Sequence, residues 1–249
     1  MNHTRAAHRR LERLAFRARP SLETIEFDGW ILRFADGYTK RANSVNPHFG
    51  STLPVSEKIA QCEALYAERE LPTIFRLTPF SQPEALDRQL AEVGYRLLDR
   101  SLVLTSRPMQ RPAPGPGSVR HVPRDEWLAT FDRLHRLEPT DRAVHRRIVE
   151  TAEGSSCFAQ IDEDGESVSC GLGVLVEDAV GLFDLFTAPD RRRCGHGGTV
   201  VASIVRWACR HGARTAYLQT HSRNNPALRL YERLGFALAY PYWYRMAEP

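Results

Sequence analysis

Hydrophobic and polar positions along this chain repeat with two periods, one of two residues and one of three to four. A period of two is typical of a half-buried strand, whereas spacings of three and four are typical of an amphipathic helix. In the first half they predict helices at 4–17, 56–70 and 83–93, and strands at 24–34, 38–45, 73–77 and 95–105. Asp36-Gly37, between the first two strands, predicts a hairpin turn.

The second half alternates between the same two periods. They predict strands at 118–122, 156–161, 167–176, 180–187, 215–220 and 236–244, and helices at 124–137, 141–151, 198–211 and 226–234. Val200, Ile204 and Ala208 share one face of the helix at 198–211, so we expect that face to join a core. Strands and helices alternating in this way indicate the α/β class.

A segment rich in Pro and Gly, 107–117, separates the two halves. It has no apolar periodicity and is predicted to be an extended linker. We therefore expect a first domain at 1–106 and a second at 118–249, both of ordinary domain size.

The two expected domains end in similar ways. In each, a helix leads to a strand, then to a helix that begins at Pro83 or Pro226, and then through Gly94 or Gly235 to a last strand. This similarity favours a duplicated unit. A chance recurrence is the alternative, because helix-strand units are common.

Composition narrows the class of protein. Of the 249 residues, 42% are hydrophobic and 26% are charged, as in ordinary globular domains. The net charge of +4 is modest and spread along the chain, so we expect no nucleic-acid partner. Since no apolar run approaches the ~18 residues that span a bilayer, we expect no membrane partner either.

The cysteines point to a reducing compartment. They are odd in number, contain no C-x-x-C pair, and stand at Cys62, Cys157, Cys170, Cys194 and Cys209. This pattern indicates neither a disulfide framework nor a zinc site. We therefore expect no metal and a cytoplasmic location.

The stretch from Phe183 to Gly198 indicates an anion site. An apolar strand leads through a Pro turn to three arginines, 191–193, and then to Gly195 and Gly197 at a helix start. Glycines let the backbone approach a ligand closely, and a helix N-terminus attracts anions. Arginines add charge-assisted hydrogen bonds to phosphate. The alternative is an ordinary helix start beside a solvated arginine run.

Two familiar phosphate sites do not fit this stretch. A P-loop requires Lys followed by Ser or Thr after its last glycine, whereas Thr199-Val200 follows Gly198. A dinucleotide site requires G-x-G-x-x-G with an acidic residue ~20 positions further on, and that spacing is also missing.

Two motifs of the second half occur in a fixed order. Arg192-Arg-Cys-Gly195-His-Gly197 comes first, and Asn224-Asn-Pro-Ala-Leu-Arg-Leu-Tyr231-Glu-Arg-Leu-Gly-Phe follows a helix and a strand later. Together they resemble the acetyl-CoA loop and the following helix of the GNAT (general control nonderepressible-related) N-acetyltransferase superfamily. The resemblance covers about 118–246. It implies a mixed, largely antiparallel central sheet flanked by helices and, with the duplication, a tandem arrangement of two GNAT-like halves.

The resemblance also implies a site for acetyl-CoA, the acyl donor. Strand-edge residues would bind the pantetheine arm, loop N–H groups the pyrophosphate, and an asparagine the cofactor arm. The implied residues are Leu185, Phe186, Thr187, Arg192, Arg193, Cys194, Gly195, His196, Gly197, Gly198 and Asn224. Tyr231 would give a proton to the departing thiolate, a role that suits a phenol because it is neutral at pH 7. Without the resemblance, packing would explain Tyr231.

The general base is less clear from the sequence. Asp184 lies on the strand before the loop, where many relatives in the superfamily place a carboxylate. If the strand is regular, Asp184 and Phe186 face one side and Phe183 and Leu185 the other. A structural salt bridge explains Asp184 equally well, because an unpaired buried carboxylate is costly. Weaker candidates are His121, Glu177 and His221. The family implies direct attack by the amine, without a cysteine nucleophile at Cys194.

The first half resembles a degenerate copy. With Gly94 aligned to Gly235, Leu90 falls at the position of Tyr231, and 46–54 contains no R-x-x-G-x-G motif. We therefore expect one active site in the chain. Polar residues within 29–33 and 40–47 would either face substrate or belong to a covering sheet with local turns.

Three functions are compatible with the sequence. The first is N-acetylation of a small-molecule amine such as an amino acid, an amino sugar or an antibiotic. The second is acetylation of a protein lysine or N-terminus, and the third is a non-catalytic acetyl-CoA sensor. Duplication supplies a surface that single-domain relatives gain by pairing, so we expect a monomer, with a dimer as the alternative.

Overall fold

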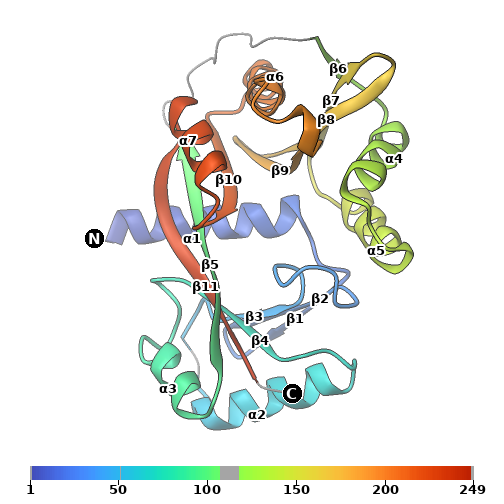
Figure 1. Ribbon diagram of the computed structural model, residues 1–249. Coiled ribbons are helices and arrows are strands. Elements are labelled where there is room, and N and C mark those ends of the chain that lie inside the picture. Colours follow the sequence, from blue (N-terminus) through green and yellow to red (C-terminus); the bar gives the residue numbers. More distant parts are fainter. Residues whose placement is uncertain (1, 51, 107–117, 248–249) are drawn as a thin grey trace. The chain divides into compact units, whose positions relative to one another are not determined.

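The computed structural model describes residues 2–50, 52–106 and 118–247, and the linker predicted at 107–117 lies outside the described residues. The chain forms two compact units (Figure 1). Unit 1 contains the described residues up to Leu102 together with those from Tyr240 onward, and unit 2 contains those from Val103 to Ala239. These bounds differ from the sequence halves because each unit includes part of a strand from the other half.

The strands of unit 1 lie in the order β1-β2-β3-β4-β11-β5, with only the start of β5 (Arg96–Ser106) and the end of β11 in this unit. Its elements are α1 (Asn2–Ala18), β1 (Glu23–Phe27), β2 (Trp30–Phe34), β3 (Ser44–Asn46), α2 (Val55–Ala67), β4 (Ile74–Leu77), α3 (Leu86–Glu92) and the end of β11 (Ala237–Met246). From β1 to β11 in this order, neighbouring strands are antiparallel except for β3 and β4. Aromatic residues Trp30, Tyr66, Phe75 and Tyr95 lie in its buried core with Leu90.

The first hairpin turns earlier than the sequence predicted. The run 24–34 is two strands, because Phe27 pairs with Trp30 across the two-residue turn Asp28-Gly29. Both turn residues have positive φ, 41° and 82°, as a tight hairpin turn requires. The later Asp36-Gly37 does lie between two antiparallel strands, β2 and β3, but within the longer loop 35–43 rather than in a tight turn.

Asn43 explains why 38–45 is largely a loop. Its side chain accepts hydrogen bonds from the backbone N–H groups of Ala35 and Gly37 and donates to the carbonyls of Tyr38 and Thr39. These bonds satisfy backbone groups that a strand ladder would otherwise pair. Only the last residues of the predicted strand form β3.

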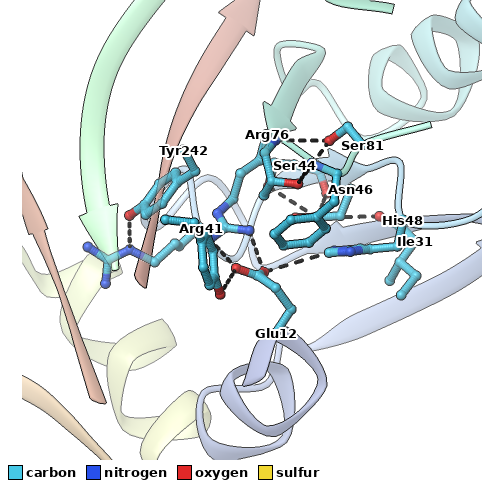
Figure 2. A network of polar contacts seen from close by, with 12 residues as sticks. Glu12, Ile31, Arg41, Ser44, Asn46, His48, Arg76, Ser81 and Tyr242 are labelled. Carbon is cyan, nitrogen blue, oxygen red and sulfur yellow. Dashed lines mark hydrogen bonds and ion pairs between the residues drawn. The ribbon is translucent and has the colours of Figure 1, made fainter. Parts of the chain in front are cut away.

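A buried polar network joins α1 to two strands of unit 1 (Figure 2). The guanidinium of Arg76 on β4 donates to both carboxylate oxygens of Glu12 on α1, at 2.6 and 3.0 Å. The hydroxyl of Tyr240 on β11 also donates to Glu12, at 2.7 Å. Burial raises the pKa of Glu12, but the charge and hydrogen bonds of Arg76 outweigh it and hold the pKa at about 2. Glu12 is therefore an anion that ties three elements together.

The strands of unit 2 lie in the order β5-β10-β9-β8-β7-β6. Its elements are the end of β5 (Arg96–Ser106), β6 (Val119–His121), α4 (Arg124–His135), α5 (Pro139–Glu150), β7 (Ser155–Glu163), β8 (Glu166–Val176), β9 (Ala179–Thr187), the 3-10 turn Pro189–Arg191, α6 (His196–Arg210), β10 (Thr215–His221), α7 (Asn225–Arg233) and the start of β11. Strands β6 to β9 are antiparallel, and β9 and β10 are parallel. The predicted mixed, largely antiparallel sheet flanked by helices is confirmed.

Helix α6 lies close against β8. A Cβ atom added at Gly173 would lie 2.2 Å from Ile204 of α6, and one at Gly171 would lie 2.8 Å from Val200. Both distances are too short for real atoms, so these positions require glycine for the helix to approach the sheet. The predicted apolar face of this helix is therefore the face that packs on the strands of unit 2.

The helices α3 and α7 end with the same backbone bonds. The N–H of Tyr95 donates to the carbonyl of Leu90, and the N–H of Phe236 donates to that of Tyr231, both at 2.9 Å. The glycine before each donor has positive φ, 91° at Gly94 and 81° at Gly235. This is the same helix-ending motif in both units. It aligns Leu90 with Tyr231, as the sequence comparison predicted.

No helix within residues 2–50, 52–106 and 118–247 is both long enough and apolar enough to cross a bilayer.

Candidate active site

A bulge interrupts strand β9. The register with β8 shifts between Cys170 and Leu172, so Asp184 and Leu185 of β9 together oppose one residue of β8. Asp184 has a φ of 50°, an uncommon value for a residue other than glycine. The strand is buried before the bulge and partly exposed from Asp184 to its end. The bulge therefore changes the direction of the Asp184 side chain at the point where the strand reaches the surface.

Regular alternation along β9 was a wrong prediction. Phe183 and Phe186 pair with β8 residues that lie two apart, so they share one face of the sheet. Leu185 lies on the other face, where its side chain and that of Val200 both approach Gly171. The extra residue of the bulge reverses the order of faces, which separates Phe183 from Leu185.

Asp184 is hydrogen-bonded to a histidine that sequence reasoning did not single out. His145 Nε2, on α5, lies 3.0 Å from Asp184 Oδ2. The His145 side chain is fully buried, whereas that of Asp184 is 15% exposed. The signal was present in the sequence, because His145 lies among Val144, Ile148 and Val149 on the buried face of its helix. A histidine on such a face needs a polar partner.

Aromatic rings line the region around this pair. The ring of Phe131 on α4 lies 4.6 Å from the His145 imidazole and 5.1 Å from that of His135. His135 in turn lies 5.3 Å from Phe186, two residues beyond Asp184. The partly exposed carboxylate therefore lies in largely apolar and aromatic surroundings.

The predicted acetyl-CoA loop has an anion-binding backbone. Arg193 and Gly195 have positive φ, 67° and 87°, and Gly195 caps α6, which begins at His196. The first N–H groups of a helix have no acceptor within the helix, so here they are available to an anion. The predicted residues of 192–198 thus form one turn at the helix start. Cys194 is exposed, and its thiol contacts the carbonyl of Arg192 at 3.6 Å.

The loop is fixed on two sides. The imidazole of His196 is buried, and its Nε2 lies 3.2 Å from Glu163 Oε1 at the end of β7. A Cβ at Gly198 would lie 3.2 Å from Leu230 of α7, so the two helices are close there. The loop, the start of α6 and the middle of α7 are therefore neighbours.

Strands β9 and β10 part at the same end of unit 2. Their parallel pairing runs from Ala179 with Thr215 to Leu182 with Leu218. Beyond the last pair, β9 continues to Thr187 and β10 to His221. Backbone groups of 185–187 on this side of β9 therefore lie past the ladder with β10, as binding of an extended pantetheine arm would require.

Helix α7 carries the remaining two predicted residues. The Asn224 side chain caps the helix by accepting a hydrogen bond from the N–H of Ala227 at 3.4 Å. Tyr231 is 8% exposed, and its ring lies 6.1 Å from that of Phe236. Burial raises the pKa of Tyr231 to about 12, so the phenol keeps its proton at neutral pH.

The weaker base candidates have other contacts. His121 Nε2 lies 2.9 Å from the hydroxyl of Ser203, and burial lowers the pKa of His121. The ring of His221 accepts a hydrogen bond from the N–H of Arg223 at 3.1 Å. Neither contact involves β9, so Asp184 is the candidate base that lies on the strand of the predicted site.

Polar residues of the strands in unit 1 bond locally. Arg33 donates to the carbonyl of Arg41 at 2.8 Å and to that of Arg19. Asn46 donates to the carbonyl of Ser44 at 2.8 Å. These contacts agree with a covering sheet whose polar groups satisfy local turns.

The chain is similar to known proteins along nearly its whole length. A family model described as "Probable histone acetyltransferase Rv0428c C-terminal" matches residues 5–245. The uncharacterized N-acetyltransferase YobR of Bacillus subtilis is 26% identical over 244 residues, which cover 96% of this chain and 98% of that protein. The probable histone acetyltransferase Rv0428c of Mycobacterium tuberculosis is 28% identical over 248 residues, covering 94% and 72% respectively. A solved GCN5-related N-acetyltransferase from Kribbella flavida has a TM-score of 0.73 at 17% identity, covering 99% and 95%.

Proposed function

Since the chain belongs to the Rv0428c C-terminal family, within the GNAT superfamily of N-acetyltransferases, we propose that it transfers the acetyl group of acetyl-CoA to a small-molecule amine. The chain is an acyltransferase, and the proposal concerns its donor and its acceptor. An amino acid, an amino sugar or an antibiotic carries a suitable primary amine. Unit 2 would perform the reaction.

The fit of unit 2 to acetyl-CoA supports the donor. The N–H groups at the start of α6 and the positive-φ turn at Arg193 and Gly195 suit a pyrophosphate. Residues 185–187 of β9 lie beyond the ladder with β10 and suit the amide groups of the pantetheine arm. Acetyl-CoA supplies the acetyl thioester when bound, and a backbone N–H of this strand end would polarise its carbonyl.

The carboxylate of Asp184 carries the proposal for the acceptor. It is partly exposed at a bulge, next to the strand end that suits the thioester. An amine is protonated at neutral pH, so it must lose one proton to solvent before its nitrogen attacks the carbonyl carbon, and it loses a second as the N–C bond forms. Asp184 would accept that second proton. Phe186, two residues further along β9, packs with the ring of His135, and this aromatic pair would suit a small acceptor.

Tyr231 would complete the transfer. As the C–S bond breaks, the sulfur of the leaving group gains negative charge and takes a proton from the phenol. Burial holds the pKa of Tyr231 at about 12, so the proton is present at neutral pH when the sulfur leaves. The aligned residue of unit 1 is Leu90, which has no proton to give. The proposal therefore includes one catalytic unit and one degenerate GNAT-like unit. It also includes a cytoplasmic location and a monomeric state.

A protein substrate is the second candidate. It is favoured by one finding, the name of the Mycobacterium tuberculosis relative as a probable histone acetyltransferase. A lysine side chain would then take the place of the small amine, with the same roles for Asp184 and Tyr231.

The test measures thiol release from acetyl-CoA against a panel of small amines and lysine peptides. Wild type is compared with Tyr231→Phe, and calorimetry measures CoA binding by both. We expect kcat to fall roughly a hundredfold or more, because a proton donor is lost, with CoA affinity unchanged. Tyr66→Phe is the control, since its hydroxyl donates to the Arg33 carbonyl within unit 1 and should not affect kcat.

Each outcome selects one function. Turnover of a small amine supports the proposal, whereas turnover of peptides alone favours the protein substrate. CoA binding without any turnover favours a sensor. Absence of CoA binding would contradict the role of the loop at 192–198, and an unchanged kcat in Tyr231→Phe would contradict its role as acid.

A further inference from the structure

We propose that His145 is a positioning residue for Asp184, to which it donates a hydrogen bond from Nε2 to Oδ2 over 3.0 Å. The bond would fix the orientation of the carboxylate toward the acceptor amine. This inference rests on the proposed acetyl transfer and deepens it. It concerns a residue outside both sequence motifs.

Burial assigns different roles to the two side chains. His145 is fully buried, so a substrate cannot reach it, whereas 15% of the Asp184 side chain is exposed. An ionised carboxylate has no proton to donate, so the proton in this bond belongs to Nε2. Asp184 is therefore the group that meets the amine, and His145 acts through it.

Packing fixes the imidazole in place. Its centroid lies 4.6 Å from the ring of Phe131 and 6.1 Å from that of Trp127, both on α4. Its neighbours Val144 and Ile148 on α5 are buried as well. A ring held by two helices gives the donor one position, and such support is what holds a reactive group in a productive geometry.

The bulge gives Asp184 a need for this support. A residue at a positive φ of 50° in a strand has departed from the ladder that orients its neighbours. The side chain then depends on its own contacts for direction. A donor from α5 supplies that direction and partly offsets the cost of desolvating the carboxylate.

The first arm of the test uses no substrate. Nitrogen NMR of the histidine-labelled protein reports which ring nitrogen of His145 carries hydrogen, with His145→Gln to assign the signals. We expect a protonated Nε2 whose resonance shifts in Asp184→Asn. An unprotonated Nε2, or a resonance that ignores Asp184→Asn, would overturn the proposed bond.

The second arm compares His145→Leu with His145→Gln in acetyl transfer to the best amine of the panel. Leucine removes the donor, whereas glutamine keeps an N–H close to the place of Nε2. We expect kcat to fall about tenfold to a hundredfold in His145→Leu, as for a lost hydrogen bond to a charged group. KM for acetyl-CoA should change less than twofold, and His145→Gln should recover most of kcat.

His48→Leu and His48→Gln are the matched controls. His48 is also buried beside a carboxylate, with Nε2 3.9 Å from Glu12 Oε2, but it lies in unit 1. Neither control should change kcat. Equal losses in His145→Leu and His145→Gln would reduce His145 to a packing residue and overturn the proposal. If wild type acetylates no amine, the proposed function fails, and the NMR arm alone decides the bond.

Discussion

Glu12 shows at the scale of one residue how a buried charge is retained. Two hydrogen bonds from Arg76 and one from Tyr240 replace the water that the carboxylate loses on folding. Such a pair contributes little compared with apolar packing, but removing one partner leaves the other charge buried alone. The cost of losing Glu12 is therefore mainly the cost of an unpaired Arg76.

Replacement of Glu12 tests this argument. Glu12→Gln should lower the free energy of unfolding by about 3 kcal/mol or more, because the buried guanidinium loses its counter-charge. Urea denaturation followed by far-UV circular dichroism measures the change. Glu23→Gln is the control, since Glu23 pairs with Arg69 at the surface and should cost less than ~1 kcal/mol. Equal losses in the two variants would contradict the argument.

Acid should destabilise unit 1 through His48. Burial lowers the pKa of His48 to about 4, against 6.5 for an unperturbed histidine. The unfolded chain therefore binds a proton before the folded one does, so stability falls as pH drops from 6.5 towards 4. His48→Gln should reduce the loss of stability between pH 7 and pH 4.5 by up to about 3 kcal/mol. Calorimetric Tm values at the two pH values measure it, and identical pH dependence in both proteins would refute it.

Sequence reasoning at the residue scale predicted a site from two motifs and their resemblance to a family. The structure places the loop at 192–198 and Tyr231 on neighbouring elements of unit 2, and their roles stay predictions. The partner of Asp184 was missed because His145 is 39 residues away in sequence and meets it only through packing of α5. The bulge was missed because an extra residue leaves no mark on a run of apolar side chains.

Helix α6 illustrates the scale of the element, because glycines in the left-handed region lie at both of its ends. Gly195, with a φ of 87°, precedes the helix, and Gly212, with a φ of 91°, follows it. A side chain at either position adds similar backbone strain, roughly 1–2 kcal/mol. Only the first position belongs to the predicted phosphate loop.

The two glycines therefore allow a matched comparison. Gly195→Ala should weaken CoA binding about tenfold or more, because the strained loop no longer presents its N–H groups to the pyrophosphate. Gly212→Ala should lower Tm to a similar extent without changing CoA affinity, since open space surrounds its Cβ position. Calorimetric titration with CoA distinguishes the two. Equal affinities would show that the loop does not bind the pyrophosphate.

Elements were predicted better than their pairing. Most helices and strands lie within a few residues of the predicted bounds, because periodicity is a local property. The turn at Asp28-Gly29 was missed in favour of Asp36-Gly37, although both carry the same dipeptide. What distinguishes them is the side chain of Asn43, which holds the second segment as a loop.

At the scale of the whole molecule, the two units exchange the ends of β5 and β11. The strand after α3 contributes residues from Val103 to unit 2, and the strand after α7 contributes residues from Tyr240 to unit 1. No local pattern predicts this, because either strand could follow its own helix back into its own sheet. The exchange is therefore a property of topology, and each unit contains a strand end from the other half of the chain.

Truncation tests the exchange. A chain that ends at Ala239 should lose the order of unit 1, because β4 pairs with β11 from Ile74 with Met246 to Leu77 with Trp243. Hydrogen exchange should show loss of protection in β4, and a peptide of residues 240–249 should restore it. Asp87→Asn offers a milder variant, since Asp87 accepts hydrogen bonds from Trp243 and Arg245. Retained protection in the truncated chain would contradict the pairing.

The exchange also sets an order of events during synthesis. A ribosome makes β4 first, and the end of β11 that pairs with it emerges roughly ten to thirty seconds later at ~5–20 residues per second. The described residues of unit 2, up to Ala239, have all been synthesised before the end of β11 is made. Unit 2 thus has its full set of strand segments first. Until the end of β11 emerges, β4 presents an open sheet edge that nascent-chain chaperones can recognise.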